Sequence, residues 1–308
     1  MLNYKISSRK YFNLLFFTAI FLCYMTRVSI SQQRTTGQRE HFRVPEIKIE
    51  TIERNIDVGG RKLNCRMYGK GEPVVVLISG FGALQEIWNP IITDIAEITT
   101  VITYDRAGYG KSEIGDLPTH GEQSSKDLNI LLEKLGISGK CIFLGHSYGG
   151  RILRIFASMY PEKAAGMIIE DTSYEDMRIY MRKILKGEEL EFFKRFESMS
   201  SGNTRNPRTE LDYLNVSWEQ VQRSGPLPEV PLTVLTAGIL PEHRDFSRET
   251  GNRLRKKRME GQKKLAQLVP GGKHIIVEDV GHIMHLEKPE PIIDAVIEMV
   301  KNIRNKSR

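Results

Sequence analysis

Hydrophobic positions recur along this chain in two patterns. Short apolar runs without alternation, such as Val74–Ile78, are typical of strands buried on both faces of a sheet. Longer segments with apolar residues three or four apart are typical of amphipathic helices. We expect buried strands at 74–78, 101–104, 140–144, 165–171, 232–236 and 275–277. We expect helices at 88–98, 124–135, 151–160 and 291–300.

Strands and helices alternate from residue 74 to the end of the chain, which predicts βαβ units and a parallel sheet covered by helices on both faces. Before this part, Ile47–Ile52 alternates with period two, and Lys62–Tyr68 follows a glycine-rich turn. These two segments predict an antiparallel hairpin. The fold class is therefore α/β, with a mostly parallel, doubly wound sheet over residues 46–308.

One long segment, about 173–230, interrupts the alternation. It contains no convincing buried strand, and charged stretches with helical spacing occur at 178–185, 188–196 and 218–223. A connection of this length inside a compact domain usually has a function. We interpret it as a helical cap inserted over the site rather than as a second domain.

The N-terminal segment accounts for much of the net charge of +7. Residues 1–31 contain four basic residues and no acidic one, which leaves 41 basic against 38 acidic residues in the rest of the chain. The basic residues precede the apolar run Tyr11–Met25, and small residues follow at Ser29 and Ser31. This order predicts an export signal cleaved after Ser31, and hence a secreted, periplasmic or envelope-associated protein. An uncleaved anchor is the alternative, although the run is shorter than the roughly 20 residues that span a bilayer.

Residues 32–45 are polar and end at Pro45, so we expect an extended leader there. Of the three cysteines, Cys23 lies in the signal, and Cys65 and Cys141 do not form a disulfide framework. No histidine and cysteine spacing resembles a zinc site, so we expect no metal and no cofactor.

A basic run in the C-terminal third raises the question of nucleic-acid binding. Its residues are scattered around a predicted helix that also contains Glu249 and Glu260, and no aromatic residues interleave them. We interpret the run as a solvated helix face and expect no nucleic-acid partner. The run consists of Arg253, Arg255, Lys256, Lys257, Arg258, Lys263 and Lys264.

The strongest chemical signal is Gly145-His146-Ser147-Tyr148-Gly149-Gly150, which lies between a buried strand and a helix. This context fits a nucleophile elbow, in which a sharp turn raises the serine above the sheet. We expect Ser147 to be strained, and a Cβ at position 145 or 149 to collide with neighbouring backbone.

A serine nucleophile needs a general base, and His282 is the candidate. It follows the last strand, at the carboxyl edge of the sheet where Ser147 is also expected. His274 lies at the opposite end of the same strand, and His285 is expected to begin the next helix. The elbow turns His146 away from the Ser147 hydroxyl.

The acid that orients the base is less well defined. Gly238 and the residues after it provide no carboxylate at the expected spacing, although Glu242 and Asp245 come slightly later. Asp171 ends an apolar strand at the correct edge and is our preferred candidate. Glu170 is a further alternative, and period two sends these neighbours to opposite sides, so only one of them can face His282.

An acyl-transfer site also needs backbone N–H donors for the oxyanion. The residue after the nucleophile, Tyr148, provides one at the start of a helix. The loop Ser79–Gly82 follows the first parallel strand, and Phe81 is our choice for the second donor.

Four stretches, taken in order, resemble the α/β-hydrolase superfamily: Ser79–Gly82, Tyr104–Ser112, the elbow, and Gly281-His282. The resemblance covers about residues 47–303 and implies an α/β-hydrolase fold, with Asp105–Ser112 as a structural turn. Two departures are Ser79, where a histidine is common, and the missing acid after Gly238. The latter is similar to a subgroup with the acid after the sixth strand, which includes haloalkane dehalogenases. Dehalogenases and epoxide hydrolases use an Asp nucleophile, whereas this chain has Ser147.

These residues predict a serine hydrolase that acts on a small carboxylic ester through an acyl-enzyme, with a Ser147–His282–Asp171 triad. Trp218 and the Phe192-Phe193 pair are candidates for lining an acyl pocket, or else for packing the cap onto the core. A triad aminopeptidase, thioesterase or C–C bond hydrolase is the first alternative. A non-catalytic binding or signalling protein of the same fold is the second. Contact with a membrane is expected only through an uncleaved N-terminal segment.

Overall fold

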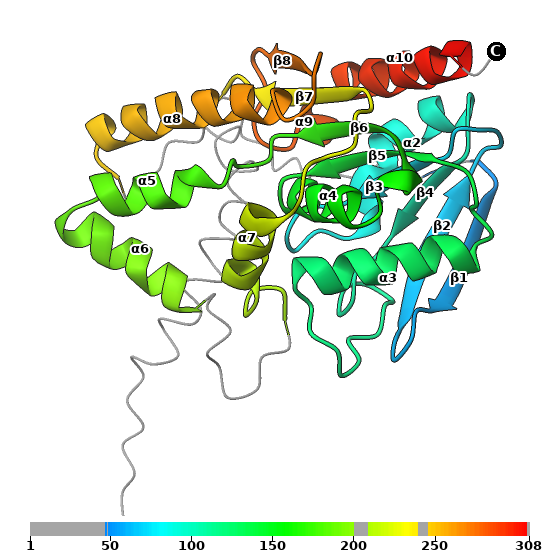
Figure 1. The fold of residues 1–308 in the computed structure, drawn as a ribbon, viewed down its shortest axis with the longest axis horizontal. Coiled ribbons are helices and arrows are strands. Elements are labelled where there is room, and N and C mark those ends of the chain that lie inside the picture. Colours follow the sequence, from blue (N-terminus) through cyan, green and yellow to red (C-terminus); the bar gives the residue numbers. More distant parts are fainter. Residues whose placement is uncertain (1–46, 48, 200–208, 240–245, 307–308) are drawn as a thin grey trace, which may run out of the picture. The chain divides into compact units, whose positions relative to one another are not determined.

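A computed structural model describes residues 47, 49–199, 209–239 and 246–306, all within one compact unit, Glu46–Arg308. Within these residues, eight strands form one sheet in the order β1-β2-β4-β3-β5-β6-β7-β8 (Figure 1). The strand β2 is antiparallel to both of its neighbours, and all other pairs are parallel. The strands are β1 (Thr51–Asp57), β2 (Lys62–Tyr68), β3 (Val75–Ile78), β4 (Val101–Tyr104), β5 (Cys141–His146), β6 (Ala164–Glu170), β7 (Leu232–Ala237) and β8 (Lys273–Val277). This is the predicted mostly parallel α/β architecture.

Helices cover both faces of the sheet (Figure 1). One face packs against α3 (Gly121–Lys134), α4 (Tyr148–Met159) and α8 (Arg248–Ala266). The other packs against α2 (Asn89–Ala96), α9 (Met284–Glu287) and α10 (Glu290–Lys306), and the short helices η2 (Gln85–Trp88) and η3 (Pro161–Lys163) complete the connections. Alternate residues of β3 pack on opposite faces of the sheet: Val76 and Ile78 face α4, whereas Val75 and Leu77 face α2. The predicted double burial of this strand is therefore confirmed.

Three helices lie between β6 and β7: α5 (Asp176–Ile184), α6 (Gly187–Met199) and α7 (Leu214–Arg223). They have a small core of their own, in which Ile184, Leu185 and Phe193 pack with Leu254 of α8. The helix α7 packs against α3 and α4, and α5 packs against α8. We call these three helices and their connections the cap.

The first strand differs from its prediction, which was wrong in position. Strand pairing begins at Thr51, opposite Tyr68, and ends at Asp57, opposite Lys62. Ile47 and Ile49 instead pack against the core before the ladder starts. The turn sets this register, because Val58 N donates to Arg61 O at 3.0 Å and closes the hairpin there. An apolar alternation can thus arise from packing beside a sheet as well as from a place within it.

No helix among the described residues is long and apolar enough to cross a membrane. The predicted signal (1–31) and leader (32–45) lie outside the described residues.

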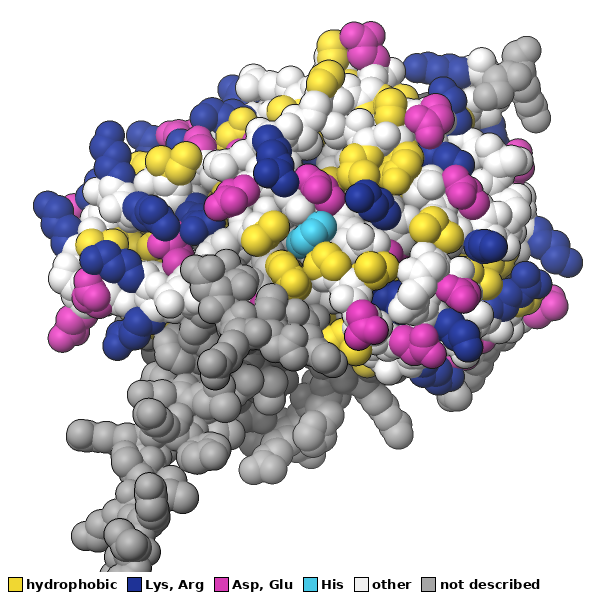
Figure 2. Space-filling model, turned by 60° about the horizontal axis from the view of Figure 1, so that its bottom comes forward, with side chains coloured by type: hydrophobic (Ala, Val, Ile, Leu, Met, Phe, Trp, Pro, Cys, Tyr) yellow, Lys and Arg dark blue, Asp and Glu magenta, His cyan; other side chains and the backbone are white. Residues whose placement is uncertain are grey.

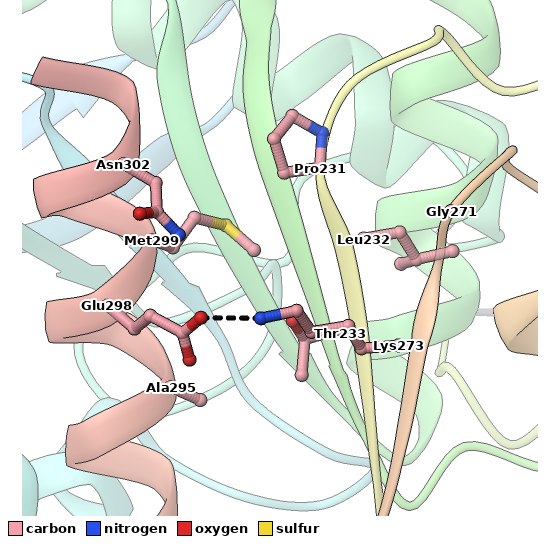
Figure 3. A pocket seen from close by; sticks show the side chains of 9 residues that line it. All are labelled: Pro231, Leu232, Thr233, Gly271, Lys273, Ala295, Glu298, Met299 and Asn302. Atoms are coloured by element: carbon pink, nitrogen blue, oxygen red, sulfur yellow. Dashed lines mark hydrogen bonds and ion pairs between the residues drawn. The ribbon is translucent and has the colours of Figure 1, made fainter. Parts of the chain in front are cut away.

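On the face seen in Figure 2, basic and acidic side chains are interspersed, and apolar side chains gather around a histidine. A cavity of ≈ 60 Å³ lies between α10 and the amino ends of β7 and β8, beside the Lys273–Glu298 ion pair (Figure 3). The cavity is therefore at the amino ends of the parallel strands, whereas Ser147 follows the carboxyl end of β5.

Candidate active site

The elbow has the predicted strained geometry. Ser147 follows β5 with φ 52° and ψ −114°, a conformation that side chains rarely adopt. A Cβ on Gly145 would lie 2.6 Å from the Gly149 carbonyl oxygen, and one on Gly149 would overlap the Ile78 carbonyl oxygen. Ser147 N donates to Glu170 O at 2.8 Å, which ties the turn to the end of β6. The side chain of Ser147 is therefore held at the carboxyl edge of the sheet, and the residue is partly exposed.

Asp171 and His282 meet at the same edge. His282 Nδ1 and Asp171 Oδ2 are 2.6 Å apart, and the Asp171 side chain is 2% exposed against 25% for His282. The other oxygen, Oδ1, accepts from Ala237 N at 3.0 Å and from the Arg258 guanidinium. Burial alone would raise the pKa of Asp171, but the bond and charge of His282, together with Arg258 and the Ala237 N–H, hold it below its usual value. An ionised Asp171 orients the ring by accepting a hydrogen bond from Nδ1, which leaves Nε2 as the ring nitrogen not bound to Asp171.

The adjacent carboxylate, Glu170, binds a different histidine. It accepts from His285 Nδ1 at 2.8 Å and from His285 N at 3.2 Å, and both side chains are fully buried. His146 Nε2 donates to the His282 carbonyl oxygen at 2.9 Å, with their rings 4.7 Å apart. Glu170 and His146 thereby hold the turn on which His282 lies. Sequence reasoning missed this support, because it weighed these residues only as members of the triad.

Charge within this buried support is also shifted. Burial lowers the pKa of His146 to about 3, against the opposing charge of Glu170, so this imidazole is neutral. Burial alone would raise the pKa of Glu170, but the charge of His285 and its hydrogen bonds to the carboxylate hold it below its usual value. Ligand atoms of His146, Glu170 and His285 lie within 4.8 Å of one another, close enough to hold a metal ion. Such an ion would have to displace the His285–Glu170 hydrogen bond.

The geometry separates the candidates that the sequence left open. Asp171 contacts His282, whereas Glu170 contacts His285. His274 Nε2 lies 3.0 Å from Thr236 Oγ1. The alternatives Glu242 and Asp245 lie outside the described residues. The catalytic roles of Ser147, His282 and Asp171 stay a prediction.

The loop proposed for the oxyanion lies beside Ser147. A Cβ built on Gly80 would lie 2.7 Å from His146 Nδ1 and 3.4 Å from the Ser147 Cβ, so this loop packs closely against the elbow. The next residue, Phe81, packs edge to face on Tyr148 with ring centroids 6.2 Å apart. The two residues chosen as backbone donors therefore contact each other at the elbow. Their role as donors stays a prediction.

Arg106 connects this loop to the cap. Its guanidinium donates to Ser79 O at 2.6 Å and to Gly80 O at 2.8 Å, and it also binds both carboxylate oxygens of Glu210. The ion pair is buried, since the side chains of Arg106 and Glu210 are only 2% and 1% exposed. Burial opposes the charge of Arg106, but Glu210 raises its pKa above the usual value. The sequence placed Arg106 in a structural turn and gave no indication of its distant partner.

The helix α7 of the cap contacts the elbow helix directly. Ser217 Oγ lies 2.9 Å from the Tyr148 hydroxyl, and the ring of Trp218 lies under the Arg151 guanidinium, 3.8 Å from its centroid. Phe193, by contrast, is buried in the core of the cap. Of the residues proposed to line an acyl pocket, Phe193 packs the cap, and Trp218 lies against α4.

The interpretation of the basic run on α8 as a solvated face was wrong in part. Arg258 points inward to Asp171, with 14% of its side chain exposed, and Lys257 binds Asp176 of the cap at 2.6 Å. Arg253, Arg255 and Lys256 are exposed as predicted. Some cations of this helix therefore face the protein and others face water, and the order of charges along the sequence does not show which are which.

The fold agrees with comparisons to known proteins. A model of the family described as alpha/beta hydrolase fold matches residues 73–228, and the chain belongs to this family. It is 28% identical over 173 residues to the uncharacterized protein YqjL of Bacillus subtilis, covering 55% of this chain and 64% of that protein. It is 26% identical over 173 residues to 2-(acetamidomethylene)succinate hydrolase of Mesorhizobium japonicum, covering 54% of this chain and 61% of that protein. The matches thus span less than two thirds of these relatives.

A solved structure shares the fold at low identity. The thermophilic esterase from Thermogutta terrifontis, with malate bound, superposes with a TM-score of 0.57 at 19% identity. The match covers 82% of this chain and 99% of the esterase chain. It identifies the same architecture over nearly the whole esterase.

Proposed function

We propose that this chain is a serine hydrolase that cleaves small carboxylic esters through an acyl-enzyme. The observation that carries the proposal is a strained serine on a nucleophile elbow, at the sheet edge where a buried aspartate binds a histidine. A serine by itself would not indicate any particular reaction. A serine raised next to an oriented imidazole is the arrangement that acyl transfer requires.

In the first half of the reaction, Ser147 Oγ attacks the acyl carbon while His282 Nε2 takes the hydroxyl proton. The carbonyl π electrons move to oxygen, and the resulting oxyanion accepts hydrogen bonds from the N–H groups of Phe81 and Tyr148. When the tetrahedral intermediate collapses, the ester C–O bond breaks and His282 returns the proton to the departing alcohol. Asp171 stays ionised and stabilises the imidazolium.

In the second half, water attacks the acyl-enzyme and His282 takes its proton. Collapse of the second tetrahedral intermediate releases the carboxylic acid, and the proton returns to Ser147 Oγ. The balance is one ester and one water consumed, with one acid and one alcohol formed. No redox partner is needed.

A fluorophosphonate probe tests this proposal on the purified protein. The wild type should be labelled and should hydrolyse short p-nitrophenyl esters, and Ser147→Ala should do neither. Labelling that survives Ser147→Ala would overturn the assignment of the nucleophile. A folded wild type that neither labels nor cleaves would favour the non-catalytic alternative.

The bond that is cleaved needs a separate test. One relative is named as a hydrolase of an acetamidomethylene succinate, which supports a small-molecule substrate without fixing an ester. A panel of esters, thioesters, amides and C–C substrates at equal concentration distinguishes these reactions. We expect kcat/KM to be highest for esters.

We also propose that the chain is exported by its N-terminal segment. Expression of the full chain, followed by fractionation and N-terminal sequencing, should yield an exported protein that begins at Gln32. Retention in the membrane with an intact N-terminus would support the uncleaved anchor instead.

A further inference from the structure

Arg151 lies four residues after Ser147 on α4 and has no anionic partner among the residues that the structure describes. Its guanidinium stacks on Trp218, 3.8 Å from the ring centroid. It makes no hydrogen bond and no ion pair with any residue that the structure describes. Because removing a guanidinium from water without a counter-charge costs free energy, a partner from outside the chain is expected here.

The neighbouring arginines on α4 and in the cap are already paired. Arg154 binds both carboxylate oxygens of Glu175, at 2.6 and 2.9 Å. Arg178 forms an ion pair with Glu197. These carboxylates are therefore occupied, and Arg151 is the arginine of these three that binds no carboxylate of the described residues. Burial lowers the pKa of Arg151 to about 10, which leaves it protonated at neutral pH.

The position of Arg151 relates it to the nucleophile. Four residues of α-helix advance about 6 Å, so Arg151 follows Ser147 by one turn. Its ring partner, Trp218, is next to Ser217, whose hydroxyl contacts Tyr148. The guanidinium thus lies where the cap meets the elbow helix, and Arg151 is partly exposed, which leaves it accessible to a ligand.

We infer that Arg151 binds a carboxylate carried by the substrate, a few bonds from the scissile carbonyl. The substrate class is then a half-ester of a short dicarboxylic acid or an ester of similar length with a terminal acid group. Stacking on Trp218 fixes the plane of the guanidinium and presents its free N–H edge to the carboxylate. This inference rests on the proposed function, because it names the substrate for the same serine.

Matched esters with acyl chains of equal length test the inference. The probes are p-nitrophenyl hydrogen glutarate and p-nitrophenyl valerate, which differ in the terminal carboxylate. We expect the wild type to have the higher kcat/KM for the glutarate. Arg151→Met should lower the glutarate-to-valerate ratio about 10- to 100-fold, the size of one charge-assisted hydrogen bond. Arg151→Lys should recover part of the ratio, and added salt should lower it in the wild type.

Arg223→Met is the matched control, since it removes an arginine from α7, the helix whose Trp218 stacks on Arg151. Arg223 lies on α7 with 65% of its side chain exposed and pairs at the surface with Glu122. This variant should keep the wild-type ratio. A wild type with no preference for the glutarate, or an Arg151→Met variant whose ratio is unchanged, would overturn the inference. Fluorophosphonate labelling of Ser147 is scored in every variant, so that loss of the nucleophile chemistry itself is recognised as failure of the proposed function.

Discussion

Asp171 Oδ2 lies 2.6 Å from His282 Nδ1, although 111 residues separate them in the chain. Asp171 follows β6, which ends at Glu170, and His282 follows β8, so the contact spans the end of β7, which lies between these two strands. At the end of β7, Gly238 leaves room for no side chain, because a Cβ there would be 2.9 Å from the Val277 carbonyl oxygen. The carboxylate comes instead from one strand earlier, and Arg258 reaches it from α8.

Asp171→Asn should lower kcat/KM for a p-nitrophenyl ester by about 10⁴-fold while the protein stays folded. The amide cannot hold Nδ1 of His282 in the required tautomer, and it does not stabilise the imidazolium. Steady-state kinetics measure the loss, and far-ultraviolet circular dichroism checks the fold. Asp245→Asn and Glu242→Gln are the controls and should retain activity. A loss of similar size in either control would assign the acid to that residue.

Sequence patterns predicted the layered fold because strands buried on both faces and amphipathic helices leave local signals. Val101–Tyr104 is a strand with the predicted bounds, and Ser147 has the strain that the surrounding glycines require. Long-range charge pairing leaves no local signal. Glu210 and Arg106 are 104 residues apart, and neither sequence environment indicates the other. The inward position of Arg258 could not be predicted for the same reason, since it lies in a run of cations on α8 that includes the exposed Arg255 and Lys256.

Glu210→Gln should slow labelling of Ser147 by a fluorophosphonate about ten-fold or more. The reason is that the loop Ser79–Gly82, proposed to bind the oxyanion, would be displaced and would lose part of that stabilisation. The substitution weakens the contact that holds Arg106, and Arg106 in turn holds the carbonyl groups of Ser79 and Gly80. Second-order labelling rates measure the effect independently of any substrate preference.

Glu197→Gln is the control for this pair. Glu197 also binds arginines, Arg178 and Arg182, but both lie within the cap. This variant should destabilise the cap without slowing labelling to the same extent. Equal slowing in both variants would mean that the cap acts as a whole and that the Arg106–Glu210 pair has no special effect on the loop.

Acidification should destabilise the protein through His146. Its pKa is about 3 in the folded chain against 6.5 ordinarily, so between these values the unfolded chain binds a proton that the folded chain does not. The free energy of unfolding therefore falls as the pH is lowered through this window. His146→Gln keeps an N–H for the His282 carbonyl oxygen and removes the titration, so its stability should fall less steeply.

Urea unfolding between about pH 7 and about pH 5 measures this difference. His120 and His274 also have lowered pKa values and act in the same direction in both proteins. The lowered pKa values of Glu170 and Asp171 remove stability only at more acid pH. The difference between wild type and variant thus isolates His146. Parallel curves would show that this imidazole does not resist protonation.

Two glycine substitutions should have opposite effects on stability. In Gly149→Ala, the new Cβ would overlap the Ile78 carbonyl oxygen and lie 2.6 Å from the Ser79 carbonyl oxygen. Both obstacles are backbone atoms, so no side-chain movement relieves them, and we expect a loss of more than about 4 kcal/mol. Gly251→Ala lies on α8 with nothing within 4 Å of its Cβ, and it should gain about 0.5–1 kcal/mol. Thermal and denaturant unfolding rank the two variants against the wild type. A folded Gly149→Ala protein that still labels with fluorophosphonate would show that the elbow can open without losing Ser147, which contradicts the tight backbone approach inferred for this turn.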